Sequence, residues 1–492
     1  MLGICLNSIM PFLPPFLDQL TLPLLVGFVW CVAMWGWPVA TIIVMPLFFP
    51  LYLVKFTIYG VPFSLVEWFI YMAFFTHLLK TYVQWRRHDE FFFSKAWAFL
   101  RQRFGKGEAT THEVRASTTL WIPVILMILS VLISLFIVPG EMDRREVFGI
   151  FKSWFITPVL YFYLIIHVLP GLRSIRRCLE WYTISAVLLS FWGIVQFVLG
   201  ATITPDGRVS GPFMSANYLA LYVMPAVVFV VLRLWHLFFV PKDYKGVIGM
   251  FMKMFHGQER VSTTAVIRYA LAAAIILCAL YLTRSFGAFL GLSVAVMVYA
   301  MYHWFFSPWR LRGRRAFVKF GVFFVSIVTL TTMFFVTGDT EKFKQMFNIK
   351  SQSSSSVRLE VWKVSSEFIG EDPIFGIGPG RFEDEYRRRA PEILQKEPYE
   401  KEMLHPHNIF LMFWLSAGLL GLISFLWLIS MLFYTIAKID KEDGRKRLGV
   451  ICGTMLLAIL VHGLVDTPIW KNDLALQFWM IAGIIARLRY TA

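Results

Sequence analysis

The feature that most constrains this chain is a series of long apolar runs that recur along its whole length. A helix needs about 20 mainly apolar residues to cross the roughly 30 Å hydrocarbon core of a bilayer. Runs that reach or approach this length lie near residues 20–36, 39–54, 61–82, 119–138, 147–168, 178–200, 217–240, 266–282, 286–306, 316–336, 408–437, 447–462 and 472–488. Only 16% of the residues are charged, against roughly 25% in an average soluble domain. The sequence therefore predicts an all-α polytopic membrane protein with about 12–13 transmembrane helices.

Lysine and arginine are concentrated in alternate loops. The basic loops are 83–118, 173–177, 233–268, 310–319 and 438–447. Because basic residues near span ends resist translocation, we assign these loops to the cytoplasm. The opposite side receives short, weakly charged loops and one long segment, 337–407, and long segments translocate largely regardless of charge.

This pattern predicts a multi-pass protein of the cytoplasmic (inner) membrane with one integrated membrane domain. Residues 1–336 would hold the amino-terminal spans and residues 408–492 the carboxy-terminal spans. The large extracytoplasmic loop, 337–407, would lie between the tenth and eleventh apolar spans. Whether residues 20–54 contribute one broken element or two spans is left open, because only Trp35–Pro38 separates the two runs.

Charge and cysteine content exclude other classes. The formal net charge is +16, but its basic clusters are dispersed over several loops with no aromatic stacking surface between them, so no nucleic acid partner is expected. The five cysteines are scattered without CxxC or Cys/His spacing, which predicts neither a disulfide frame nor a structural zinc site.

Two arginines stand at predicted outer boundaries. Arg208 lies in Gly207–Phe213, and Ser215 or Asn217 can cap the following helix, whose amino terminus favours anions. Arg284 lies between two apolar runs, where a guanidinium can hold a phosphate bidentately. The alternatives are a surface turn with a capped helix for Arg208, and an interfacial anchor that snorkels to the headgroups for Arg284.

The long outer segment carries a third arginine. Residues 357–369 have the apolar spacing of an amphipathic helix, with Arg358 and Trp362 on a shared face. Gly376, Gly378 and Gly380 predict a tight turn with exposed amides; the GxGxxG pattern of a nucleotide loop is absent. The run 387–389 of three arginines is interpreted as a solvated helix face.

Histidines mark two further boundaries. His405 and His407 precede Asn408 at the start of an apolar run, and histidine is suited to proton abstraction near neutral pH, although it is also a common interfacial residue. His462 and Asp466 are at positions i and i+4, so on one helix they could pair, either to hold two helices together or to take part in a site. No residue pattern requires a metal or cofactor, and none is expected.

Together these segments resemble the bacterial O-antigen ligase and O-antigen polymerase superfamily of polytopic, GT-C type glycosyltransferases. The resemblance rests on motifs that occur in the family's order over about residues 200–480. These motifs are R-x-x-G-x-F-x-x-x-N-Y at 208–218, Arg358 with Trp362-Lys363, Asp372–Gly380, and His407-Asn408 before a helix with Gly418 and Gly421.

The resemblance implies metal-independent, inverting transfer of a glycan from an undecaprenyl-diphosphate carrier to an acceptor hydroxyl. His407 would be the base, and Arg208, Arg284 and Arg358 would bind the diphosphate. Asn217, Asn408 and Asp466 would support them. Family members often carry S-R-G-A where this chain has Ser285–Ala288, so the arginine is two positions early. Two residues rotate a helix by about 200°, so Arg284 reaches the same pocket only if the backbone is broken there.

Several alternatives remain open at the level of sequence. A ligase would move a finished glycan to a lipid or other acceptor, a capsule-type polysaccharide polymerase would extend a glycan, and a protein O-oligosaccharyltransferase would modify protein. A different class is a transporter of the same lipid-linked sugar, which predicts internal repeats or charges at mid-membrane. Either His405 or His407 is chemically suited to be the base.

Overall fold

The apolar runs fold as helices. The computed structural model describes residues 21–58, 61–87, 112–137, 144–201, 204, 207–239, 263–306, 354–439 and 444–489. Each predicted span that falls within these residues is mainly helical, with one strand at the start of the 61–82 run. The predicted span 316–336 and the basic loop 310–319 lie outside the described residues.

The described residues divide into two compact units. Their boundaries fall within α9 (Leu172–Val198), in the first turn of α16 (Ser354–Glu371), within α19 (Gly444–His462) and between Pro468 and Ile469. The first unit holds residues up to Cys178, Val357–Gly449 and those from Ile469 on. Its elements are α2 (Thr21–Gly36), α3 (Pro38–Val44), the 3-10 helix η2 (Met45–Leu53), β1 (Lys55–Ile58), β2 (Val61–Ser64), α4 (Leu65–Arg87), α6 (His112–Ile137), α7 (Arg144–Phe151), the π-helical turn η3 (Lys152–Ile156), α8 (Thr157–Val168), α16 (Ser354–Glu371), α17 (Phe382–Leu394), α18 (Ile409–Ala437) and α20 (Asn472–Leu488). The second unit holds most of α9 and α19 with α10 (Ala216–Phe239), α12 (Thr263–Thr283) and α13 (Phe286–Phe306).

The fold is that of an all-α polytopic membrane protein. Six helices of the described residues are long and apolar enough to cross a membrane, namely Leu120–Ile137, Glu146–Val168, Leu172–Val198, Ala216–Leu237, Thr263–Thr283 and Ile409–Ala437. Shorter apolar helices are Pro23–Gly36, Pro38–Leu53 and Phe286–Tyr302. Large apolar side chains such as Phe28, Phe136 and Phe191 stay more than half exposed, which suits contact with lipid rather than water.

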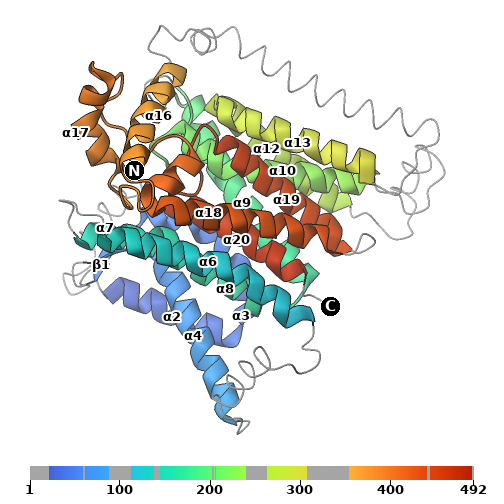
Figure 1. Cartoon of the computed structure of the whole chain (residues 1–492). Coiled ribbons are helices and arrows are strands. Elements are labelled where there is room, and N and C mark those ends of the chain that lie inside the picture. The colour runs from blue at the N-terminus through green and yellow to red at the C-terminus, as the bar shows by residue number, and fades with distance from the viewer. Residues whose placement is uncertain are drawn as a thin grey trace. The chain divides into compact units, whose positions relative to one another are not determined.

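Long-range helix pairs build the first unit. The helices α6 and α18 run side by side, and α20 packs along α8, although each pair is far apart in the sequence (Figure 1). Nearly every residue of α20 is buried, so this 17-residue helix is a core element that other helices surround. Its burial differs from that of a lipid-facing span, which would expose one apolar face.

A small hairpin modifies the predicted 61–82 span. Val61–Ser64 pairs antiparallel with Lys55–Ile58, and the rings of Phe56 and Phe63 lie 6.1 Å apart across the two strands. The helix therefore starts at Leu65. Its start is a capping box: the Ser64 N–H donates to Glu67 Oε2 at 2.8 Å, and the Glu67 N–H donates to Ser64 Oγ at 3.4 Å.

The helix α18 is broken at Gly418, whose φ of 65° is left-handed. Residues 373–378 fill the break: the N–H groups of Ile377 and Gly378 donate to the Leu415 carbonyl at 2.8 and 3.1 Å, and the Leu419 N–H donates to the carbonyls of residues 373 and 374 at 3.2 Å. Ser130 Oγ of α6 donates to the Ala417 carbonyl. Irregular backbone is tolerated inside a membrane protein when its polar groups are satisfied in this way.

Candidate functional site

The predicted site residues are found in both units. Arg358, His405, His407 and Asn408 belong to the first unit, and Arg208, Asn217, Arg284 and Asp466 belong to the second. The two groups are described in turn.

The histidine loop, Leu404–Asn408, leads into α18. Asn408 is the N-cap, and its side-chain oxygen accepts hydrogen bonds from the N–H groups of Phe410 and Leu411 at 2.9 and 3.1 Å. His407 has a φ of 48°, which non-glycine residues rarely adopt. Its ring lies 4.5 Å from that of His405, centroid to centroid, in an edge-on arrangement, and both rings are half-buried. The loop thus holds two imidazoles against each other at the mouth of a capped helix.

The amphipathic helix that carries Arg358 is attached to this loop. The indole Nε1–H of Trp362 donates to the Pro406 carbonyl at 3.0 Å. Arg358 lies one helical turn before Trp362, so both side chains share a face of α16. The predicted helix at 357–369 is confirmed, and it brings the segment of Arg358 alongside the histidine loop within the first unit.

The segment between α16 and the histidine loop packs with α16 and with Leu415 of α18 in a small apolar cluster. Val364 and Phe368 of α16 pack with Phe382 and Tyr386 of α17 in one apolar cluster. Burial raises the pKa of Tyr386 to about 12, so its phenol stays neutral. This cluster gives α16 a rigid support.

The predicted solvated face is confirmed for Arg387 and Arg388, which are exposed. Arg389 is half-buried, and its guanidinium carbon lies 5.0 Å from the centroid of the Phe368 ring. Arg387 and Arg388 pair with carboxylates of their own helix, and Arg389 pairs with Glu371 of α16. The Arg389 hydrogen bond lowers the pKa of Glu371 below its ordinary value.

The glycine turn is confirmed, with φ of 68°, 87° and 80° at Gly376, Gly378 and Gly380, but its predicted exposed amides are wrong. Gly376 and Gly378 are buried, and their N–H groups donate to the carbonyls of Asp372 and Leu415 at 2.9 and 3.1 Å.

In the second unit, Arg208 is oriented by Asn217. Arg208 Nη1 donates to Asn217 Oδ1 at 3.2 Å, and the Asn217 N–H donates to Ser215 Oγ at 3.2 Å. The predicted cap therefore comes from Ser215, at the amino terminus of α10. The guanidinium is held next to a helix end that itself favours anions.

The backbone is broken at Arg284, which is the condition that its place two positions before the family's arginine sets. Its φ is 48°, between the end of α12 and the start of α13, and its N–H donates to the Tyr281 carbonyl at 3.0 Å. The Val209 N–H donates to the Leu282 carbonyl at 3.4 Å. This contact joins the segments that carry Arg208 and Arg284.

The expectation that His462 and Asp466 lie on one helix is wrong. The helix α19 ends at His462, so Asp466 lies beyond it in a turn, where its buried carboxylate accepts from the Thr467 N–H at 2.8 Å. His462 packs on Gly287 of α13, where an added Cβ would lie 2.5 Å from the imidazole Cδ2. Gly287 thus makes room for a buried histidine three residues after Arg284.

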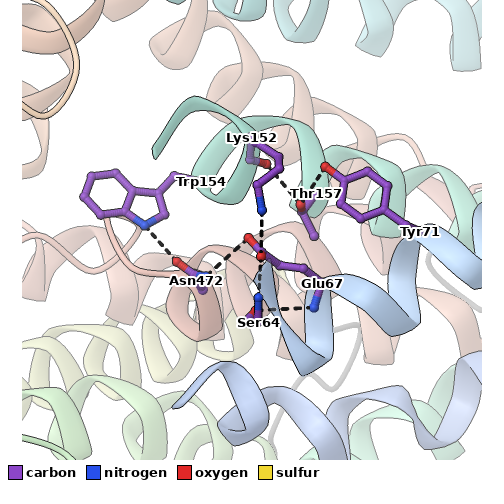
Figure 2. Close-up of polar contacts among 7 residues, drawn as sticks. All are labelled: Ser64, Glu67, Tyr71, Lys152, Trp154, Thr157 and Asn472. Atoms are coloured by element: carbon purple, nitrogen blue, oxygen red, sulfur yellow. Dashed lines mark hydrogen bonds and ion pairs between the residues drawn. The ribbon is translucent and has the colours of Figure 1, made fainter. Parts of the chain in front are cut away.

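A polar cluster in the first unit escaped the sequence analysis. Lys152 and Glu67 form a buried ion pair, with Lys152 Nζ 2.8 Å from Glu67 Oε2 (Figure 2). Lys152 Nζ also lies 4.1 Å from the centroid of the Phe63 ring. The ion pair joins the capping box of α4 to the π-helical turn before α8, a type of irregularity that is frequent at functional sites.

Asn472 extends this cluster to the start of α20. Its Nδ2 donates to Glu67 Oε1 at 3.4 Å, and its Oδ1 accepts from the Trp154 indole at 2.9 Å (Figure 2). Ser64-x-x-Glu67 was visible in the sequence as a capping box, and Lys152 was visible as a charge inside an apolar run. Their partnership was not visible, because 85 residues separate them.

Comparison with known proteins shows that the middle of the chain resembles a known family. Residues 271–426 match the family model described as O-Antigen ligase. A protein of Rickettsia conorii, whose assigned name of polysaccharide ligase is provisional, is 23% identical over 216 residues. This match covers 43% of the present chain and 47% of the relative, so the chain spans about half the length of that protein.

The resemblance inferred from the motifs is therefore confirmed at family level over residues 271–426, a shorter range than the 200–480 expected. The matched range includes Arg284, Arg358, His407 and Asn408. It excludes Arg208, Asn217 and Asp466, whose roles rest on the motifs and on the local geometry.

Proposed function

We propose that this protein transfers a glycan from an undecaprenyl-diphosphate carrier to an acceptor hydroxyl at the outer face of the cytoplasmic membrane. One observation carries the proposal: within the range that resembles O-Antigen ligase, the histidine loop is tied by Trp362 to the helix that bears Arg358. A base and a phosphate-binding cation on joined elements suit this reaction. The acceptor is a lipid or a glycan, and the site faces the extracytoplasmic side.

In the proposed mechanism His407 acts in its neutral form and takes the proton of the acceptor hydroxyl. The acceptor oxygen attacks the anomeric carbon as the bond from that carbon to the diphosphate oxygen breaks, with inversion. Arg208, Arg284 and Arg358 stabilise the charge that develops on the diphosphate, which leaves on its lipid. These guanidinium groups supply the charge stabilisation that a metal supplies in other transferases, so the reaction is proposed to be metal-independent.

The remaining residues act through these groups. Asn217 orients Arg208 through its side-chain oxygen. Asn408 caps α18 and so fixes the backbone that follows His407. Asp466 is proposed to support the site from its turn after α19.

The test of the base compares His407→Ala with His405→Ala in purified protein. Each variant is assayed for release of undecaprenyl diphosphate and for binding of the lipid-linked donor. His407→Ala should lower turnover by about 100-fold or more, as loss of a general base does, while donor binding persists. His405→Ala is the matched control, and loss of turnover in that variant alone would transfer the role to His405.

The test of the diphosphate contacts uses Arg208→Lys and Arg358→Lys. Lysine keeps the charge but cannot form the two parallel hydrogen bonds of a guanidinium. Both variants should bind the donor less tightly and turn over more slowly. Unchanged kinetics in both would refute the proposed diphosphate contacts.

A further inference from the structure

The loop that carries Arg208 is fastened to α9 by one buried side chain. Gln196 Nε2 donates to the Gly211 carbonyl at 2.7 Å, and the Gly211 N–H donates to Gln196 Oε1 at 3.0 Å. Gln196 is 8% exposed. A single carboxamide thus satisfies both backbone groups of one residue, as a neighbouring strand would.

The local backbone explains why this fastening is needed. Gly211 has a φ of 58°, so the chain turns sharply there, and a residue in a turn cannot place its N–H and C=O in a helix ladder. Buried backbone groups without partners are costly. Gln196 removes that cost and selects one conformation of the turn.

The same loop is fixed on both sides of Arg208. Thr204 Oγ1 donates to the Arg208 carbonyl at 2.6 Å, and the Val209 N–H reaches the Leu282 carbonyl. The Arg208 guanidinium is held by Asn217. Hydrogen bonds therefore fix the backbone at both Arg208 and Gly211. The short segment between them has little freedom to change the direction of the Arg208 side chain.

We propose that Gln196 is a positioning residue for Arg208. Its carboxamide holds the loop so that the guanidinium has its binding orientation before the diphosphate binds. Less conformational entropy is then lost when the diphosphate binds. This inference rests on the proposed role of Arg208. Gln196 itself need not touch the substrate.

The experiment measures amide hydrogen exchange of residues 207–213 and the donor KM on the same purified full-length protein. Gln196→Leu removes both hydrogen bonds and should speed exchange in 207–213 by about tenfold, the effect of losing one or two hydrogen bonds. The donor KM should rise by a similar factor, with exchange in α10 unchanged. Thr183→Val is the matched control, because Thr183 is buried in the same helix and donates only to the Leu179 carbonyl of that helix.

A second variant gives a signature that a merely structural role would not produce. In Gln196→Glu a protonated carboxyl can donate to the Gly211 carbonyl and accept from its N–H, whereas the carboxylate can only accept. At pH 5 residues 207–213 of this variant should exchange at about the wild-type rate measured at that pH. At pH 8 they should exchange faster than the wild type does at pH 8. The donor KM should be close to the wild-type value at pH 5 and above the wild-type value at pH 8.

The outcomes separate the inference from the proposed function. Wild-type exchange in both Gln196 variants, or equal loosening in Thr183→Val, would overturn the positioning role. A loosened loop with an unchanged donor KM would also overturn it if Arg208→Lys raises that KM. If Arg208→Lys leaves the KM unchanged as well, the proposed function of Arg208 fails instead, and the role of Gln196 in the reaction fails with it.

Discussion

His407 and Arg284 both have a φ of 48°, a left-handed backbone conformation that is unfavourable for residues other than glycine. Among the described non-glycine residues only Arg284, Gln395 and His407 have positive φ, and two of these were singled out as site residues from the sequence. A left-handed conformation costs roughly 1–2 kcal/mol for a residue with a Cβ. Such strain is concentrated at functional sites, where the surrounding structure holds it in place.

The strain at His407 predicts a difference between two inactive variants. The free energy of unfolding of His407→Gly should exceed that of His407→Ala by about 1 kcal/mol, because glycine adopts a positive φ without strain. Thermal unfolding in detergent measures the difference. Lower stability of the glycine variant would show that the left-handed conformation is not a source of strain.

A second residue-scale prediction concerns Tyr386. Its hydroxyl is buried and, within the described part of the chain, makes no hydrogen bond to another residue. The pKa of about 12 reflects this burial together with the carboxylates of Glu360 and Glu400. Tyr386→Phe removes an unsatisfied polar atom, so the free energy of unfolding should either rise or fall by no more than about 0.5 kcal/mol. A loss of 2 kcal/mol or more, measured by denaturant titration, would mean that the hydroxyl has a partner such as bound water.

At the scale of elements, local patterns were predictable and long-range insertions were not. The helix at 357–369, the positive φ of the glycine turn and the solvated face of Arg387 and Arg388 follow from spacing within a few residues. The break in α18 does not, because it depends on residues 373–378 entering the helix from more than 30 positions away. The pairing of Arg208 with Asn217 was likewise invisible, since it depends on how the loop closes onto α10.

The break in α18 predicts a strong effect at Gly418. A Cβ there would overlap the Ile374 carbonyl, and φ is positive. Gly418→Ala should therefore lower the free energy of unfolding by roughly 2–4 kcal/mol. Gly370→Ala in α16 is the matched control, since nothing lies within 4 Å of its Cβ position, and it should be neutral or slightly stabilising. Equal, small effects in denaturant titrations of both variants would refute the inserted segment.

The buried ion pair predicts a non-additive pair of substitutions. Lys152→Met leaves the Glu67 carboxylate without its partner and should cost about 3–5 kcal/mol of stability. Adding Glu67→Gln keeps an acceptor for the Ser64 N–H, removes the buried charge and should recover most of this loss. A double-mutant cycle in thermal unfolding measures the coupling, and strictly additive losses would contradict the pairing.

At the scale of the whole molecule, hydropathy predicted a polytopic helical membrane protein, and this is confirmed. The distribution of basic loops gave an orientation, which stays a prediction. It places the segment of α16 and α17 outside and the end of α18 in the cytoplasm. Hydropathy could not show that α20 is a buried helix and not a lipid-facing span, because it measures how apolar a run is and not what covers it.

The orientation predicts which positions are accessible from outside. In a cysteine-free background, Lys401→Cys should react with a membrane-impermeant maleimide on intact spheroplasts, since Lys401 is exposed in the segment before the histidine loop. Lys438→Cys at the end of α18 should react only after the membrane is opened. The opposite pattern would invert the topology and move the proposed site to the cytoplasm.

The most direct test of the account is to incubate the purified protein with a defined undecaprenyl-diphosphate oligosaccharide, with and without candidate acceptors. The account predicts release of undecaprenyl diphosphate together with a new glycoconjugate, as a single addition for a ligase or a ladder for a polymerase. If protein that binds the donor releases no undecaprenyl diphosphate with any acceptor, the transferase assignment is contradicted and a transporter of the same lipid-linked sugar is favoured.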